Sequence, residues 1–201
     1  MTRDVVMLID ISPPIDASIR VWPGDTPFEH DVSDIRTTVH VGAHADAPLH
    51  IVPNGSDIAS RRLDYYVGRC VVLRLAVHRG TRIVPEHLEG RVLSAPRVLL
   101  QTGTFPDPRK WNNDFASLSS ALVEHLYQHG VMLVGIDTPS VDPFDSKSLD
   151  AHQAFARNDM AMLEGLVLDH VAEGEYELIA PPLRILGVDA SPVRALLRTL
   201  D

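Results

Sequence analysis

The side chains that could do chemistry are concentrated between residues 38 and 50. This segment reads TVHVGAHADAPLH, and its titratable residues are His40, His44, Asp46 and His50. Alternate residues of an extended chain share a face, so all four lie on one side and apolar side chains lie on the other. A helix is disfavoured because Gly42 and Pro48 both interrupt it. Imidazole and carboxylate are the usual ligands of zinc and similar divalent ions, so the segment predicts a metal site.

Geometry limits how this segment could bind an ion. A straight strand would place His40 and His50 about 33 Å apart, too far for both to bind one ion. We therefore expect the chain to bend at Gly42 or Pro48. We assign the first two histidines and the aspartate to the metal, and His50, which follows the proline, to proton transfer. The alternative is an edge strand whose histidines are solvated.

A second group of donors lies in the distal part of the chain. Glu164 is the only charged residue in the apolar run from 160 to 168, and a glutamate is almost never buried without a partner. His152 precedes it by twelve residues, and on one helix the two would lie about 18 Å apart. A break at residues 157–159 could fold them back on one another. Taken alone, His152 is more typical of a surface or capping histidine.

The five proposed metal ligands are His40, His44, Asp46, His152 and Glu164. They fit two ions better than one, because a catalytic zinc usually takes three protein ligands and the carboxylate of Asp46 has two oxygens with which to bridge a pair. Binding of a single ion remains open. Zinc is the expected metal, although manganese, cobalt and iron accept the same ligand types.

Trp22 lies in the turn-rich sequence VWPGDTP at residues 21–27. We interpret it as a flat wall for an aromatic substrate, the alternative being a side chain that covers the core. Asp137 and Ser140 follow a predicted strand, where α/β folds place sites, but they could equally cap the turn. No GxSxG motif is present, and Cys70 lies in an apolar strand run where a thiol is normally inert.

The elements that must position these residues are short apolar strands and amphipathic helices. Strands are expected at residues 5–11, 71–77, 97–102, 131–137 and 183–189. The leucine spacing predicts a helix over 116–129, and Ser191 followed by Pro192 predicts a final helix. The irregular spacing and the 15 prolines argue against a plain doubly wound sheet. We expect an α/β fold in which helices pack on a mixed sheet, forming one domain over residues 1–201.

Composition excludes several classes of protein. The chain has 201 residues and a formal net charge of −9, with scattered basic residues, which disfavours nucleic-acid partners. Its apolar runs are far shorter than the roughly 20 residues that span a bilayer. Asp4 lies where a signal peptide would carry positive charge, so we expect a cytoplasmic protein with no membrane association.

Several motifs resemble those of the metal-dependent cyclase-like hydrolases. They are HVGAHADAPLH at 40–50, LDAHQAF at 149–155, LEGLVLD at 163–169, WPGDTP at 22–27 and GIDTPSVDP at 135–143. The broad family usually has threonine where Ala43 stands, and alanine there is typical of its bacterial arylformamidase branch. The resemblance implies a swivelling β/α/β-type fold, a homodimer and zinc. It places the metal ligands on the same five residues, the acid/base histidine on His50 and a substrate contact on Trp22.

The activity implied by this resemblance is hydrolysis of N-formyl-L-kynurenine, a small aromatic formamide, to L-kynurenine and formate by a metal-bound hydroxide. A related hydrolase acting on another amide, lactam or cyclic substrate is the first alternative. A metal-binding module without chemistry is the second.

Overall fold

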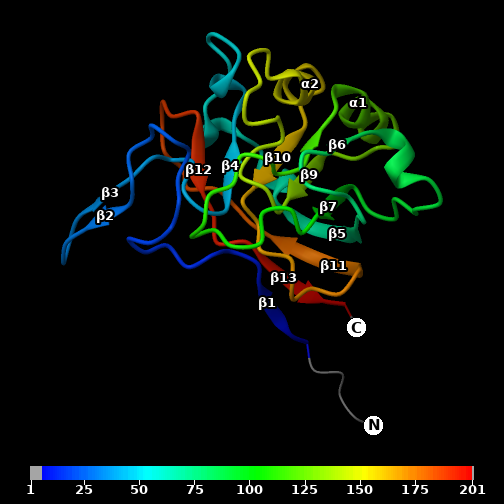
Figure 1. Ribbon diagram of the computed structural model, residues 1–201, viewed down its shortest axis with the longest axis horizontal. Helices are drawn as coiled ribbons and strands as arrows, with labels where there is room; N and C mark the ends of the chain where they lie inside the picture. The colour runs from blue at the N-terminus through cyan, green and yellow to red at the C-terminus, as the bar shows by residue number, and fades with distance from the viewer. Residues whose placement is uncertain (1–5, 201) are drawn as a thin grey trace.

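The computed structural model describes residues 6–200 and is built around a nine-stranded sheet (Figure 1). In spatial order its strands are β1 (Leu8–Asp10), β13 (Leu196–Thr199), β11 (Gly174–Ile179), β5 (Val67–Arg74), β7 (Arg97–Gln101), β9 (Leu133–Ile136), β10 (Ala161–Glu164), β4 (His44–Asp46) and β12 (Ala190–Pro192). Neighbours from β5 to β10 are parallel, and all other pairs are antiparallel. The expected mixed sheet is confirmed.

The remaining elements are short. Two additional ladders pair β2 (Glu29–His30) with β3 (Ile35–Arg36) and β6 (Arg82–Ile83) with β8 (Ser117–Leu118). The α-helices are α1 (Ser120–Gln128) and α2 (Asp150–Arg157), and the 3-10 helices are η1 (Pro48–His50), η2 (Ile58–Ser60), η3 (Leu63–Tyr65) and η4 (Pro85–Leu88). The β2–β3 hairpin projects from the body of the molecule at the left of Figure 1.

The parallel strands form the centre because their sequences are apolar on both faces. Alternate residues of β5 divide between two cores, with Val72 in one and Val71 in the other. The helices α1 and α2 lie on the same side of the sheet and contribute Leu122 and Phe155 to the second core. The first core joins Ala45 of β4 to strands near the opposite end of the sheet, so the sheet must curl around it.

The C-terminal region corrects two expectations. Residues 183–189 form no strand, and Leu186 is 78% exposed. The helix expected after Ser191 is also wrong, because this region forms β12 and β13. The hydroxyl of Ser191 donates to the carbonyl of Pro192 instead of capping a helix. Since β13 pairs with β1 on one side and β11 on the other, long-range pairing overrides the local helix signal.

The other expected elements are confirmed with shifted ends. The predicted strands at 71–77, 97–102 and 131–137 correspond to β5, β7 and β9, and the predicted helix at 116–129 corresponds to α1. The strand expected at 5–11 is β1, and its first residue, Val5, lies outside the described residues. Among residues 6–200, no helix has both the length and the apolar character needed to cross a bilayer.

Candidate metal centre and active site

Within the segment from 38 to 50 only β4 is a strand, and the chain bends where the two helix breakers lie. Gly42 has a φ of +62°, a left-handed conformation that glycine adopts without strain, and Pro48 opens η1. These bends bring the rings of His40 and His50 to a centroid distance of 4.6 Å, in place of the long separation of a straight strand. The expected bending is confirmed, while a single alternating strand over the whole segment is wrong.

Strand register brings the distal glutamate to this segment. In the antiparallel pair of β10 and β4, Glu164 lies directly opposite His44, and Glu164 Oε2 is 3.1 Å from His44 Nε2. The close approach depends on Gly165, because a Cβ there would clash with the carbonyl oxygen of Gly42. The same carbonyl accepts a hydrogen bond from His44 Nδ1 at 2.9 Å, which leaves Nε2 facing the cluster.

The chain reverses between α2 and β10, as the break at 157–159 predicts. Asp159 has a φ of +48°, and Arg61 holds it through an ion pair and also donates to the carbonyl of Met160 at 3.3 Å. His152 and Glu164 therefore face each other, with His152 Nε2 3.5 Å from Glu164 Oε1.

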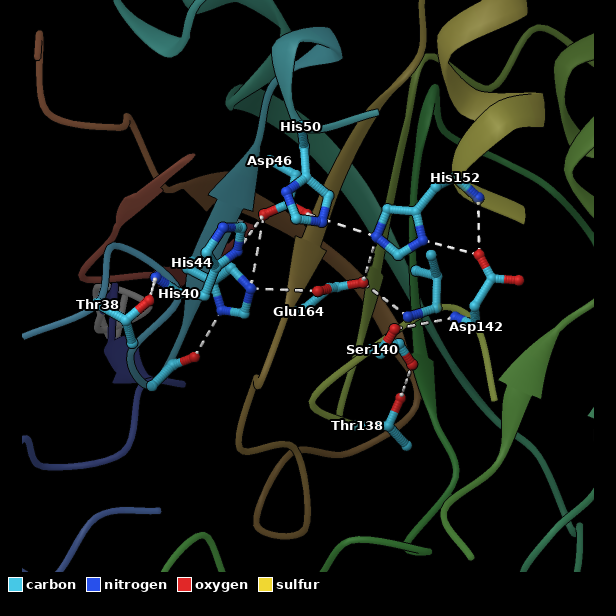
Figure 2. A network of polar contacts seen from close by, with 12 residues as sticks. Thr38, His40, His44, Asp46, His50, Thr138, Ser140, Asp142, His152 and Glu164 are labelled. Carbon is cyan, nitrogen blue, oxygen red and sulfur yellow. Dashed lines mark hydrogen bonds and ion pairs between the residues drawn. The ribbon is translucent and has the colours of Figure 1, made fainter. Parts of the chain in front are cut away.

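Asp46 is the centre of the cluster (Figure 2). Its Oδ1 lies 3.2 Å from His40 Nδ1 and 3.6 Å from His44 Nε2. Its Oδ2 lies 3.5 Å from His152 Nε2 and 3.9 Å from His50 Nε2. Both oxygens are buried, and neither accepts a hydrogen bond from any residue that the structure describes. A buried carboxylate without hydrogen bonds is costly unless a cation compensates it, so the donor set fits a metal.

Two sets of three donors lie close enough to hold an ion, with their ligand atoms within 4.8 Å of one another, and Asp46 belongs to both. One set adds His44 and Glu164 to Asp46, and the other adds His40 and His50. This grouping differs from the expected division in including His50. His152 belongs to neither set, although its Nε2 faces both carboxylates at 3.5 Å.

The electrostatics of the cluster also suit a cation. Burial raises the pKa of Asp46, but the neighbouring rings of His152 and His40 hold that pKa well below its usual range. Burial lowers the pKa of His40, and nearby carboxylates, with Asp46 first, outweigh burial and raise it to about 9. Burial likewise lowers the pKa of His152, while its contacts with Asp142 and Asp46 raise it to about 10. The carboxylates that raise these two pKa values would equally attract a metal cation, and a cation binding the ring nitrogens would compete with protons for them.

Two acidic residues that the sequence analysis did not single out orient the histidines. His152 Nδ1 donates to Asp142 at 2.7 Å, and Asp142 also accepts from the backbone N–H groups of Ala151 and His152 at 3.0 Å. His50 Nδ1 donates to Asp189 at 2.8 Å. Such partners fix the ring and the tautomer of a metal-ligating or proton-transferring histidine. The only sequence signal for Asp142 was its place in the GIDTPSVDP motif.

Asp137 is structural. Its carboxylate accepts hydrogen bonds from the backbone N–H groups of Thr102 and Gly103, both at 2.8 Å, and from the Thr102 hydroxyl at 2.6 Å. These bonds join the ends of β7 and β9. Ser140 accepts a hydrogen bond from the N–H of Asp142 and so supports the same turn. The turn-capping interpretation therefore describes Ser140, whereas Asp137 joins two strand ends.

The cluster opens into a cavity of about 760 Å³ whose other wall is aromatic. Trp22 lines it, with ring centroids 5.4 Å from Trp111 and 5.0 Å from Phe144. Phe105 packs against Trp111 at 5.6 Å. Of these four residues the sequence analysis singled out only Trp22. A flat substrate ring could lie against this wall while its polar group reaches the cluster.

Known proteins resemble this chain in sequence and in architecture. The cyclase family model, described as "Putative cyclase", matches residues 9–143. A kynurenine formamidase of Bordetella petrii is 45% identical over 206 aligned residues, which cover 96% of this chain and 98% of that protein.

Solved structures agree. One, described as a "Potential Metal-Dependent Hydrolase With Cyclase Activity", has a TM-score of 0.89 and 25% identity, covering 98% of this chain and all of its own. A "predicted metal-dependent hydrolase" from Bacillus stearothermophilus has a TM-score of 0.79 and 26% identity, covering 96% of this chain and 98% of its own. The chain belongs to the cyclase family.

Proposed function

We propose that this protein is an arylformamidase that hydrolyses N-formyl-L-kynurenine to L-kynurenine and formate. The observation that carries the proposal is the position of Asp46, a buried carboxylate without hydrogen bonds that lies between two pairs of imidazoles and lines the polar wall of an aromatic-lined cavity. The similarity to the Bordetella petrii formamidase supports the same substrate. An aromatic formamide suits a cavity with one polar and one aromatic wall.

The metal is proposed to be zinc, with two ions per chain. His40, His44, Asp46, His152 and Glu164 would hold the ions, with the carboxylate of Asp46, which belongs to both sets of donors, shared between them. When bound, such ions lower the pKa of a coordinated water to near neutrality and polarise the carbonyl of the substrate. The two oxygens of Asp46 face different pairs of histidines, which supports its bridging role.

His50 is proposed to move the proton. Hydrolysis breaks the C–N bond of the formamide, and the leaving aryl amine must gain a proton because an anilide anion is too basic to leave alone. The Nδ1–H of His50 is held by Asp189 at 2.8 Å, so its Nε2 faces the cluster and can accept a proton from water and donate it to the amine nitrogen. Its ring is half-buried at the cavity, where a substrate can reach it.

Trp22 is proposed to bind the aromatic ring of the substrate, with Trp111 and Phe144 holding its indole in place. This contact would orient the formyl group toward the polar wall and exclude water from the ring face.

We further propose that residues 1–201 form one domain and that the protein is a homodimer. The match covers nearly the whole length of the Bordetella petrii relative, which supports the single domain. The β2–β3 hairpin exposes Val32 and Ile35, at 99% and 73%, and supplies an apolar surface for a second copy. Light scattering on the purified protein tests the dimer.

The decisive experiment measures metal content and activity on one sample. We expect about two zinc ions per chain, hydrolysis of N-formyl-L-kynurenine, loss of activity with a chelator and recovery when zinc is restored. Assays with a simple formanilide and with a cyclic lactam run beside it. Preferred turnover of the lactam would favour the related hydrolases, and unfolding on chelation without any turnover would favour a structural metal site.

A further inference from the structure

Lys147 differs from most positively charged side chains of this molecule because it lines the cavity and has no polar partner among the described residues. It is one of two lysines, and it lines the cavity. The other lysine, Lys110, pairs with Asp107 at 3.5 Å and is 85% exposed. Among the lysines and arginines of residues 6–200, only Lys147 and Arg184 have no hydrogen bond or ion pair to another residue in that range, and Arg184 is not a lining residue. Lys147 is therefore a free positive charge at the substrate cavity.

The loop that carries Lys147 is held in place at both ends. At its start, Asp142 is buried and bonded to the first turn of α2. Within the loop, Ser146 donates its N–H to the carbonyl of Pro143 at 3.0 Å and accepts from the N–H of Leu149 at 3.0 Å. The loop thus presents Lys147 from a constrained backbone, which lowers the entropic cost of ordering it around a ligand.

In the sequence, Lys147 lies between a residue of the aromatic wall and a residue of the polar wall. Three residues before it, Phe144 packs on Trp22 in the aromatic wall. Five residues after it, His152 belongs to the polar cluster. A substrate whose ring lies on Trp22 would bring its remaining polar groups near this loop.

An anion in this cavity needs such a cation. The chain carries a net charge of −9, and Asp25, Asp169 and Asp189 also line the cavity. These acids would repel a carboxylate but attract an ammonium group. An amino acid carries both charges, so the cavity offers a complement to each.

We propose that Lys147 binds the α-carboxylate of an aromatic amino-acid substrate and thereby makes the enzyme prefer such substrates over plain aryl formamides. This inference rests on the proposed function and identifies which part of the substrate is recognised. Arg20 is the competing cation in the cavity, but its Nε already donates to the carbonyl of Arg109 at 3.2 Å.

The test compares two substrates in Lys147→Met. N-formyl-L-kynurenine carries the amino-acid group, and N-(2-acetylphenyl)formamide has the same aryl ketone without it. We expect KM for the first to rise about 2- to 5-fold with little change in kcat, as for loss of one exposed ion pair. Both constants for the second substrate stay unchanged. Lys147→Arg restores most of the preference, and added salt weakens the wild-type preference.

Lys110→Met is the matched control, since it removes the other lysine outside the cavity, and it leaves both substrates unaffected. Equal losses on the two substrates in Lys147→Met would overturn the proposal. So would a change of preference in Arg20→Met with none in Lys147→Met.

A binding measurement separates this inference from the proposed reaction. Calorimetry with L-kynurenine and with 2-aminoacetophenone needs no turnover. We expect Lys147→Met to weaken only the binding of L-kynurenine, by about the same 2- to 5-fold. If the wild type binds L-kynurenine in this way but hydrolyses neither formamide, the proposed reaction fails and the role of Lys147 stands. If the wild type does not bind L-kynurenine, the role of Lys147 fails.

Discussion

The two walls of the cavity are built in different ways. Most of the polar wall comes from regular elements, with His44 and Asp46 on β4, His152 on α2 and Glu164 on β10, whereas His40 lies in a turn. The aromatic wall comes from loops, since its four rings, Trp22, Phe105, Trp111 and Phe144, all lie outside helices and strands.

The two kinds of wall suit different requirements. Metal ligands need a fixed geometry, whereas an apolar binding surface can vary in its details. Antiparallel register fixes His44 opposite Glu164, and a slip of one residue would turn the ligand side chains to the other face. Donors to a metal need such precision. The aromatic wall has only to present a flat apolar surface, and loops of varied sequence can do that. We therefore expect changes in the polar wall to abolish activity and changes in the aromatic wall to alter substrate affinity.

The largest effect is expected from Asp46→Asn. An amide cannot bridge two cations as a carboxylate does, so metal content falls and kcat/KM drops by about 10³-fold or more. Elemental analysis and kinetics on the same sample measure both. Asp137→Asn is the matched control, because it is also a buried acid lining the cavity but its oxygens accept three hydrogen bonds. That variant loses thermal stability and keeps its metal. Full metal content in Asp46→Asn would contradict the bridging role.

His50→Ala tests whether His50, in the polar wall, binds the metal or transfers a proton. We expect kcat to fall by about 10²- to 10⁴-fold while the metal remains bound. His40→Ala is the comparison variant and loses metal as well as activity. His50 lies near the donors of Asp46 and His40, so loss of metal in His50→Ala would instead make it a ligand.

Asp142→Asn tests whether metal binding depends on the residue that orients a metal ligand, as it does on the ligand itself. Asp142 holds Nδ1 of His152 and caps the first turn of α2, so its loss should weaken metal binding by about 10- to 100-fold. Competition with a zinc indicator measures this change. Asp150→Asn, at the exposed start of the same helix, is the control and leaves metal affinity unchanged. Equal effects of the two variants would reduce the role of Asp142 to helix capping.

The two walls also differ in how far the sequence predicts them. The residues of the polar wall were recognisable because titratable side chains alternate with small apolar ones in the first segment, and Glu164 is isolated in an apolar run. The sequence predicted that these residues come together in space only through the expected bend at Gly42 or Pro48 and the expected break at residues 157–159. Asp142 and Asp189 escaped notice because their role depends on contacts with histidines, and Asp189 lies 139 residues from His50.

The fold shows the same limit. The central strands were predictable because burial on both faces makes their sequences continuously apolar. The C-terminal helix was mispredicted because Ser191 and Pro192 carry a strong local helix signal, whereas β13 gains hydrogen bonds from both neighbouring strands. In the aromatic wall, Trp111, Phe105 and Phe144 went unrecognised since loop residues follow no periodic pattern.

The smallest effect is expected in that aromatic wall. Trp22→Ala removes the indole that packs against Trp111 and Phe144, so KM for N-formyl-L-kynurenine should rise about 10-fold, as for loss of one stacking contact and its buried area, while kcat changes little. Trp22→Phe retains part of the flat surface and should recover part of the affinity. Steady-state kinetics and thermal melting on both variants give the answer. If Trp22→Ala instead lowers the melting temperature and reduces kcat on aromatic and aliphatic formamides alike, the tryptophan covers the core, and the substrate ring must lie on Trp111 or Phe105.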